Sequence, residues 1–288
     1  MSLNPKLSLA IGILCISFSP IFVKLAGVAP VGAAFYRVFV ALICLLPYCI
    51  IKNKFRVNRR QLTIALIAGV VFASDIAVWN MSLLKISATV STLIANLAPV
   101  WVGLLGFVLF KQRSGRLFWI GTAIAMVGML VLVGYQEVLH LQFNAGILLA
   151  TLASFLYAGY ILITKNIMAD IDVFSFMFYS MLSATVFLFL LNTIMGADII
   201  HFAPQVWGYF IGMGLLCQLI GWLTINYSLR YMASTKVAIS LLSQTVFAAI
   251  LAAFLLDEHL QLKEIIGSVI VLCGIAVTFI KPKQAVAV

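Results

Sequence analysis

The stretch Ala34–Pro47, AFYRVFVALICLLP, decides the fold class, because it is an apolar run that carries one charge, Arg37. The apolar character extends over residues 30–51. A helix of that length crosses a hydrocarbon core of about 30 Å. Similar runs recur along the whole chain, so the sequence predicts an all-α integral membrane protein. An arginine inside such a span is costly unless it faces other polar groups, so it also marks a candidate site.

The composition supports this interpretation. Of the 288 residues, 64% are hydrophobic and 9% are charged, whereas a soluble domain carries about 25% charged residues. Strands of an outer-membrane barrel would be about ten residues long with strict alternation, and the sequence lacks that pattern. We expect ten transmembrane helices joined by short loops. The expected spans are 7–27, 30–51, 61–82, 88–110, 115–134, 144–165, 172–194, 205–229, 235–256 and 262–280.

The loop charges predict the orientation. If the N-terminus is cytoplasmic, fourteen of the 18 Lys and Arg residues fall in cytoplasmic segments. Only Lys85 and Lys263 fall in outside loops, while Lys24 and Arg37 lie inside spans. Positive charge accumulates on the cytoplasmic side of membrane proteins, so we expect both termini in the cytoplasm and the protein in the cell inner membrane. The net charge of +10 comes from these loops, so the expected partner is the lipid bilayer and not nucleic acid.

An internal repeat divides the chain into two halves, residues 1–140 and 141–288. Residues 80–131 align without gaps with residues 226–277, and twelve of the 52 positions are identical. The identities include less common residue types, such as Asn80 with Asn226. Each half holds five spans, and five is odd, so the second half is expected to be inverted. Inverted repeats are frequent in secondary transporters, with the substrate near the bilayer midplane between the halves.

Four further motifs stand out in the sequence: SFSPIFVKLA (17–26), AAFYRVFVAL (33–42), NMSLLKISATVSTLIANLAPVW (80–101) and FLLDEHLQLKEIIGSVIVLCGIAV (254–277). Together they resemble the EamA-type branch of the drug/metabolite transporter superfamily. The first half departs from the pattern, because Lys111 and Gln112 stand where the second half has Asp257 and Glu258. The resemblance covers the whole chain and implies a ten-helix transporter or exporter of small metabolites. That family handles amino acids, sugars, nucleotides and drugs, so the substrate stays open.

The ionisable residues inside spans are the first candidates for a substrate site. Arg37 and Asp75 lie at similar depths, about 10 Å below the outer surface at 1.5 Å per residue. Arg37 could hold a carboxylate or phosphate with its planar guanidinium. Asp75 could pair with Arg37 in the empty site, bind a substrate amine or carry a proton. The alternative is a purely structural ion pair. Lys24 lies near the outer end of span one, where a lysine can also reach the interface.

Polar and aromatic residues in other spans extend the candidate site. Span four carries a stripe of small and polar residues on one face, with Pro99 expected to kink the helix near Asn96. Gln244 lies in mid-span and needs a partner. Close packing between helices is the alternative for each polar stripe, and the aromatic belt or the core for each aromatic residue. The further candidate substrate-binding residues are Tyr36, Trp79, Asn96, Tyr157 and Gln244.

Glycines at 121, 128, 267 and 274 are spaced seven apart within spans five and ten. This spacing predicts close helix packing, within the chain or at the interface of a homodimer. No phosphate-binding loop, nucleophile elbow or metal-ligand motif is present in the sequence. We therefore expect neither an enzyme nor a cofactor or metal site.

These features together predict a secondary transporter that works by alternating access. The expected solute is a small polar metabolite that is anionic or zwitterionic, such as an amino acid or organic acid, and export is the expected direction. The alternative is a flippase or carrier for lipid-linked or nucleotide-type cargo. That function would require a lateral opening or a larger basic cavity.

Overall fold

The computed structural model describes residues 4–134, 144–197, 200–256 and 260–280, and within these ranges the chain is helical and has no strand. It contains ten helical spans that are long and apolar enough to cross a membrane. The prediction of ten spans is confirmed, and each predicted boundary lies within two residues of the observed one. Six spans are single helices: α3 (Pro30–Ile51), α4 (Arg59–Leu83), α7 (Arg116–Val133), α9 (Ala145–Ile167), α10 (Val173–Ile194) and α15 (Leu262–Phe279).

The other four spans are interrupted. Three of them consist of two short helices: α1 (Pro5–Ser17) with α2 (Ser19–Ala26), α5 (Ala88–Ala95) with α6 (Ala98–Phe110), and α13 (Ser234–Leu241) with α14 (Ser243–Leu255). Span eight runs from α11 (Pro204–Gly212) through the π-helix η1 (Met213–Gly221) into α12 (Trp222–Tyr231). Interrupted helices release backbone groups from the usual hydrogen bonds, and in membrane proteins they accompany binding sites.

Each break has a local cause. Pro20 and Pro99 lie in the first turns of α2 and α6, where a proline cannot donate to the preceding turn. Span nine breaks at Leu242 without a proline. There the Ser240 hydroxyl donates to the carbonyl of Lys236, and the Ser243 hydroxyl donates to that of Ser240, at 2.7 Å each. Such side-chain bonds compete with the backbone ladder and bend helices.

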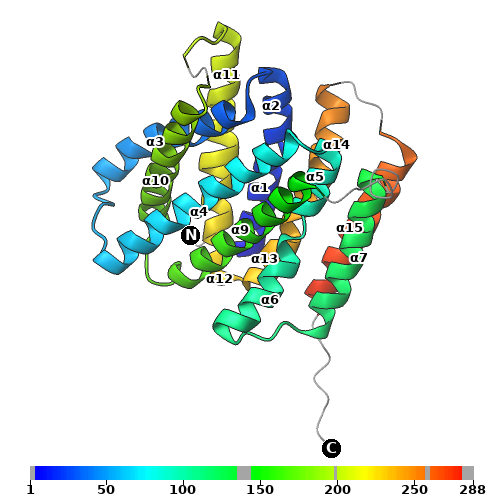
Figure 1. The fold of residues 1–288 in the computed structure, drawn as a ribbon. Helices are drawn as coiled ribbons and strands as arrows, with labels where there is room; N and C mark the ends of the chain where they lie inside the picture. The colour runs from blue at the N-terminus through cyan, green and yellow to red at the C-terminus, as the bar shows by residue number, and fades with distance from the viewer. Residues whose placement is uncertain (1–3, 135–143, 198–199, 257–259, 281–288) are drawn as a thin grey trace, which may run out of the picture.

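The contacts between spans can be compared with the predicted repeat, which stays a prediction. If spans n and n+5 exchange, the contact of α4 with α9 corresponds to that of span eight with α1, and both contacts are present. The contact of α4 with α10 likewise corresponds to that of η1 with α3. In Figure 1, α3, α4 and α10 lie at one side of the bundle, while α7 and α15 lie together at the other. The core therefore forms between the two halves and not within each half.

The glycines of α7 and α15 face each other. A Cβ atom added at Gly121 would lie 2.5 Å from the carbonyl oxygen of Gly274, and one at Gly128 would lie 2.5 Å from the nitrogen of Val271. The two backbones are in direct contact, which confirms the prediction of close packing. These faces are covered within one chain, so a homodimer would have to use other surfaces.

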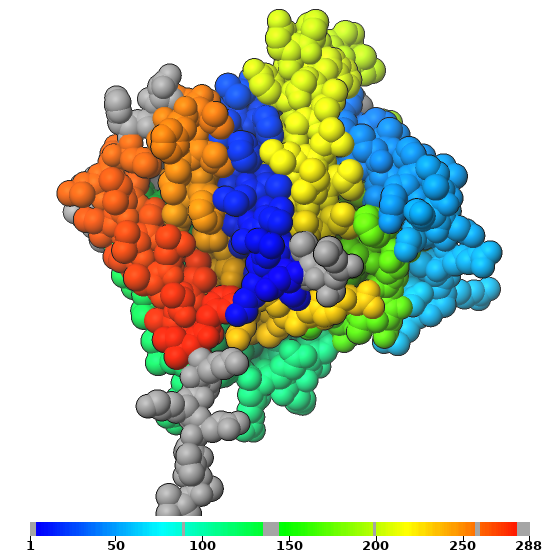
Figure 2. All heavy atoms as spheres, turned by 180° about the vertical axis from the view of Figure 1, so that it is seen from behind, coloured from blue at the N-terminus to red at the C-terminus, as the bar shows by residue number. Residues whose placement is uncertain are grey.

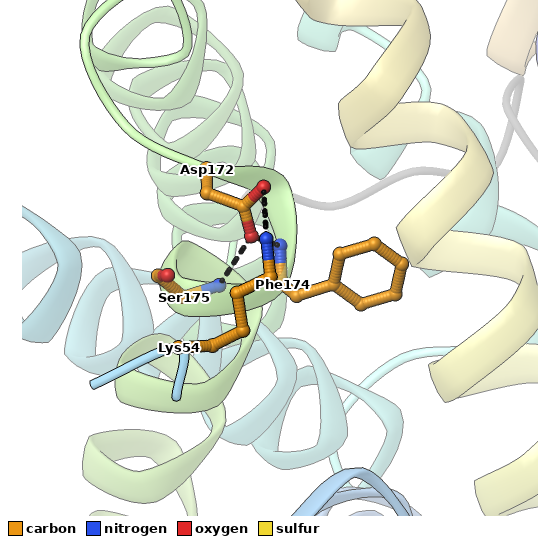
Figure 3. Close-up of polar contacts among 4 residues, drawn as sticks. All are labelled: Lys54, Asp172, Phe174 and Ser175. Carbon is orange, nitrogen blue, oxygen red and sulfur yellow. Dashed lines mark hydrogen bonds and ion pairs between the residues drawn. The ribbon is translucent and has the colours of Figure 1, made fainter. Parts of the chain in front are cut away.

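An ion pair is among the polar contacts that join the halves at the predicted cytoplasmic end (Figure 3). Lys54, in the turn after α3, lies 3.1 Å from Oδ2 of Asp172. Oδ1 of Asp172 accepts hydrogen bonds from the backbone N–H groups of Phe174 and Ser175 and so caps α10. The turn after span two is thereby tied to the start of span seven.

Candidate functional site

Arg37 lies in the first half of α3, two turns from its start, and is bound by residues from both halves of the chain. Its Nε atom donates to Oε1 of Gln218 at 2.9 Å, and its Nη1 atom donates to the hydroxyl of Ser19 at 3.1 Å. Ser19 begins α2, just after the break in span one, and Gln218 lies in the π-helix η1. Two irregular helix segments thus hold the guanidinium in place. Gln218 is itself buried.

The expected direct pair between Arg37 and Asp75 is absent. Among the described residues no ion pair or hydrogen bond joins the Asp75 carboxylate to any partner, although its charge and that of Arg37 are close enough to interact. The hydrogen bonds that Arg37 makes go instead to Gln218 and Ser19. Asp75 is half-buried, so part of its side chain remains accessible.

Tyr157, on α9, completes this group from the second half. Its hydroxyl has no hydrogen-bond partner among the described residues, and the phenol lies near enough to Asp75 and Arg37 for their charges to act on it. Like Asp75, Tyr157 is half-buried. The four residues Arg37, Asp75, Tyr157 and Gln218, drawn from four different spans, are called the central polar site below.

A cluster of buried aromatic rings packs against Tyr157 of the central polar site. The ring of Trp222 lies 6.1 Å from that of Tyr157, 5.2 Å from that of Tyr160 and 5.1 Å from that of Phe72. Asn226 fixes Tyr160 by donating to its hydroxyl at 3.2 Å. A charged pair of opposite sign beside an aromatic surface can hold a small molecule that has both charged and apolar parts.

Three buried side-chain N–H groups have no acceptor among the described residues. They are Nε1 of Trp79, Nδ2 of Asn96 and Nε1 of Trp222. Trp79 follows Asp75 by one helical turn, and Asn96 is the C-cap of α5 at the break in span four. An unsatisfied buried donor costs about 1–3 kcal/mol. These buried groups therefore lack a compensating hydrogen bond among the described residues.

The remaining predicted site residues lie elsewhere. Tyr36 stacks on Phe210 at 4.6 Å and contacts Trp207 edge-on at 5.0 Å, so it belongs to an aromatic cluster between α3 and α11. Lys24 lies in the last turn of α2 with an exposed side chain, as expected of a lysine that reaches the interface. Gln244 lies in the first turn of α14, after the break in span nine.

Gln218 and Ser19 are not among the site residues predicted from the sequence. A glutamine inside the apolar run MGLLCQLIG was a visible signal, of the same kind that drew attention to Gln244. Ser19 gave no such signal, because serine is common where membrane helices pack closely. Its role depends on the break at Phe18, which brings the start of α2 against α3.

The comparison with protein families agrees with this architecture. The model of the EamA-like transporter family matches the chain twice, over residues 6–134 and 144–280. The chain belongs to the EamA-like transporter family. Membership makes it a transporter of this family and a multi-pass membrane protein.

Relatives of known name are transporters without an assigned substrate. The uncharacterized transporter YdfC of Bacillus subtilis is 21% identical over 275 residues, which cover 95% of this chain and 90% of the relative. An uncharacterized transporter of Archaeoglobus fulgidus is 25% identical over 291 residues, covering 99% and 100%. A solved crystal structure matches with a TM-score of 0.82 and 14% identity, covering 96% of both chains. That likeness shows the fold alone.

Proposed function

We propose that this EamA-family transporter moves a small zwitterionic or anionic metabolite, such as an amino acid or organic acid, through the central polar site. The observation that carries the proposal is the bond between Arg37 and Gln218 beside an unpaired Asp75. A fixed cation and a carboxylate within an apolar bundle support this proposal. Charges at this depth are rare unless they serve a pathway or pair with each other, and Asp75 has no bonded partner among the residues that the structure describes.

The chemistry of each residue suggests its role. A guanidinium has five N–H donors, and Gln218 and Ser19 accept from two of them. Three N–H groups remain, which suits a carboxylate bound in the plane of the guanidinium. Asp75 would receive the substrate amine or carry a coupling proton. Tyr157 and Trp222 would contact the apolar part of the solute.

The interrupted spans support alternating access. The breaks at Asn96 and Leu242 are related by the internal repeat, and each lies within a membrane span. Rocking of the two inverted halves about such discontinuous helices exposes a midplane site to one side at a time. We further propose that the protein lies in the cell inner membrane with both termini in the cytoplasm and that it exports its solute. A proton gradient or exchange would drive the transport.

Thermal unfolding of the purified protein across a panel of amino acids, organic acids and sugars tests the proposal. A ligand that binds only the folded state raises the melting temperature. We expect one class of carboxylate to stabilise the wild type and the control Arg59→Ala, which removes an exposed arginine at the start of α4. Folded Arg37→Ala should lose that stabilisation. Equal stabilisation of Arg37→Ala would show that Arg37 is structural.

A further inference from the structure

A groove opens sideways between α1 and α15, away from the central polar site. Both helices pack on α14, and the groove between them has a volume of about 380 Å³. Figure 2 shows this face, with α1 in blue beside α14 and α15 in orange to red. Leu14 and Leu272 line the groove and are 44% and 41% exposed, so its wall faces the lipid.

The interior of the groove is apolar. Leu9, Ile13 and Ile275 contribute to its wall. Two serines, Ser240 and Ser243, line the groove, and their hydroxyl groups donate hydrogen bonds to backbone carbonyls of their own span. Their polar atoms are thus already bonded within the protein. The groove therefore offers apolar contact area to a hydrocarbon chain and few polar groups to a polar solute. In this it differs from the lateral opening that a flippase for polar cargo would require.

One end of the groove is cationic. Nζ of Lys6 lies 5.9 Å from the centre of the Phe279 ring, and Nζ of Lys236 lies 5.4 Å from the same centre. Lys6 and Phe279 both line the groove. No carboxylate within the described residues forms an ion pair with either lysine. The three residues belong to α1, α13 and α15, so the pair of ammonium groups is built from both halves of the chain.

An apolar groove that ends at two lysines is complementary to a lipid, which has an apolar chain and can carry an anionic headgroup. We propose that this groove binds a phospholipid with an anionic headgroup, its acyl chain along α1 and α15 and its phosphate at Lys6 and Lys236. Both lysines fall in predicted cytoplasmic segments, so the lipid would come from the cytoplasmic leaflet. Near a membrane surface each lysine adds about fivefold to the affinity for an anionic lipid.

The groove also touches the break in span nine. Ser240 and Ser243 flank Leu242, where α13 ends and α14 begins. An acyl chain packed there would fix the angle between α13 and α14. This proposal does not depend on the solute of the central polar site, and its test needs no solute.

The test measures lipid retention by native mass spectrometry and melting temperature on the delipidated protein in detergent. Phosphatidylglycerol and phosphatidylcholine with the same acyl chains are added to wild type, to Lys6→Gln/Lys236→Gln and to the control Arg59→Gln/Arg60→Gln. The control removes the same charge from the exposed start of α4. We expect the wild type and the control to prefer phosphatidylglycerol, and the lysine variant to bind it roughly thirtyfold more weakly.

A second variant tests the groove itself. Leu272→Trp fills the groove from its lipid-facing wall and should reduce retention of phosphatidylglycerol while leaving both lysines in place. Equal retention of the two lipids by the wild type would overturn the proposal. It would also be overturned if the lysine variant kept the preference, or if Leu272→Trp retained phosphatidylglycerol as well as the wild type does.

Discussion

Nε of Arg37 donates to Oε1 of Gln218 across 2.9 Å, and the two residues are 181 positions apart in the chain. Arg37 belongs to a regular helix of the first half, whereas Gln218 belongs to the π-helix of the second half. If one half moves relative to the other, this hydrogen bond must break unless Arg37 and Gln218 move together. Under the proposed alternating access, the bond would place the positive group of the central polar site at the boundary between the moving halves.

Replacing Gln218 by glutamate should block the central polar site. The new carboxylate would lie against the guanidinium and form a charge-assisted bond, about twice as strong as the neutral one. An anionic substrate then has to compete with an internal anion. We expect its apparent affinity, measured by thermal shift or equilibrium binding, to fall by at least about tenfold while the protein stays folded.

Gln218→Met is the matched control, because it keeps the length of the side chain and adds no charge. It removes one hydrogen bond, for which the expected loss of folding free energy is about 1–2 kcal/mol. Binding should weaken less than in Gln218→Glu. If the glutamate variant bound the substrate as tightly as the wild type, the substrate anion would not be held by Arg37.

Asp75→Asn should remove transport without unfolding the protein. The carboxylate has no bonded partner among the described residues, so the neutral amide relieves a buried charge. We expect the stability of the variant to equal or exceed that of the wild type by up to about 1 kcal/mol. Transport driven by a pH gradient, measured in proteoliposomes, should fall to the background level.

Counterflow exchange by Asp75→Asn separates the two proposed roles of the carboxylate. Retained exchange would assign Asp75 to proton coupling, and lost exchange would assign it to the substrate amine. Wild-type rates in both assays would show that Asp75 takes no part in transport. The ratio of folded to total protein in the liposomes corrects each rate.

The sequence was informative where one residue contrasts with its surroundings. The spans follow from apolar runs, and Arg37 and Asp75 stand out because a charge in such a run is costly. The partner of Arg37 could not be derived in this way, since it depends on the wide turn of η1 and on the packing of η1 against α3. A direct pair of Arg37 with Asp75 was one of the roles that equal depth left open, and no such pair forms, because depth fixes only one of three coordinates.

The breaks in the helices show the same limit. Pro99 predicts the break in span four, but there is no proline at Leu242, where span nine breaks at the position that the predicted repeat aligns with Asn96. At this break the hydroxyl groups of two serines donate to backbone carbonyls. The sequence does not show which acceptor a serine hydroxyl will use, because that depends on the folded structure. Tyr36 is adjacent to Arg37 in the sequence yet lies in another cluster, because successive residues on a helix point in different directions.

The contact between Lys54 and Asp172 offers a stability prediction. The side chains are 28% and 40% exposed, so the ion pair itself should contribute at most about 1 kcal/mol. Asp172 also caps α10, which adds about 1 kcal/mol. We expect Asp172→Ala to lower the free energy of unfolding by about 1–2 kcal/mol and Lys54→Ala by less than half of that.

Asp172→Asn separates the two contributions, since asparagine retains the cap and loses the charge. Its loss of stability should match that of Lys54→Ala, and the double variant should show no further loss. Added salt should reduce the difference between wild type and Lys54→Ala. Equal effects of Lys54→Ala and Asp172→Ala would mean that the cap contributes nothing.

The glycine contact between α7 and α15 gives the last prediction. A methyl group at Gly128 would lie 2.5 Å from the nitrogen of Val271 and 2.9 Å from the carbonyl oxygen of Gly267. Both are backbone atoms, so the helices have to separate, and overpacking of this kind costs about 1–3 kcal/mol. Gly128→Ala should therefore lower the melting temperature of the purified protein.

Gly208→Ala is the control, because a Cβ atom there meets no other atom within 4 Å. Alanine favours a helix over glycine by up to about 1 kcal/mol, so this variant should melt at or above the wild-type temperature. A Gly128→Ala protein as stable as the control would show that α7 and α15 do not need backbone contact to hold the two halves together.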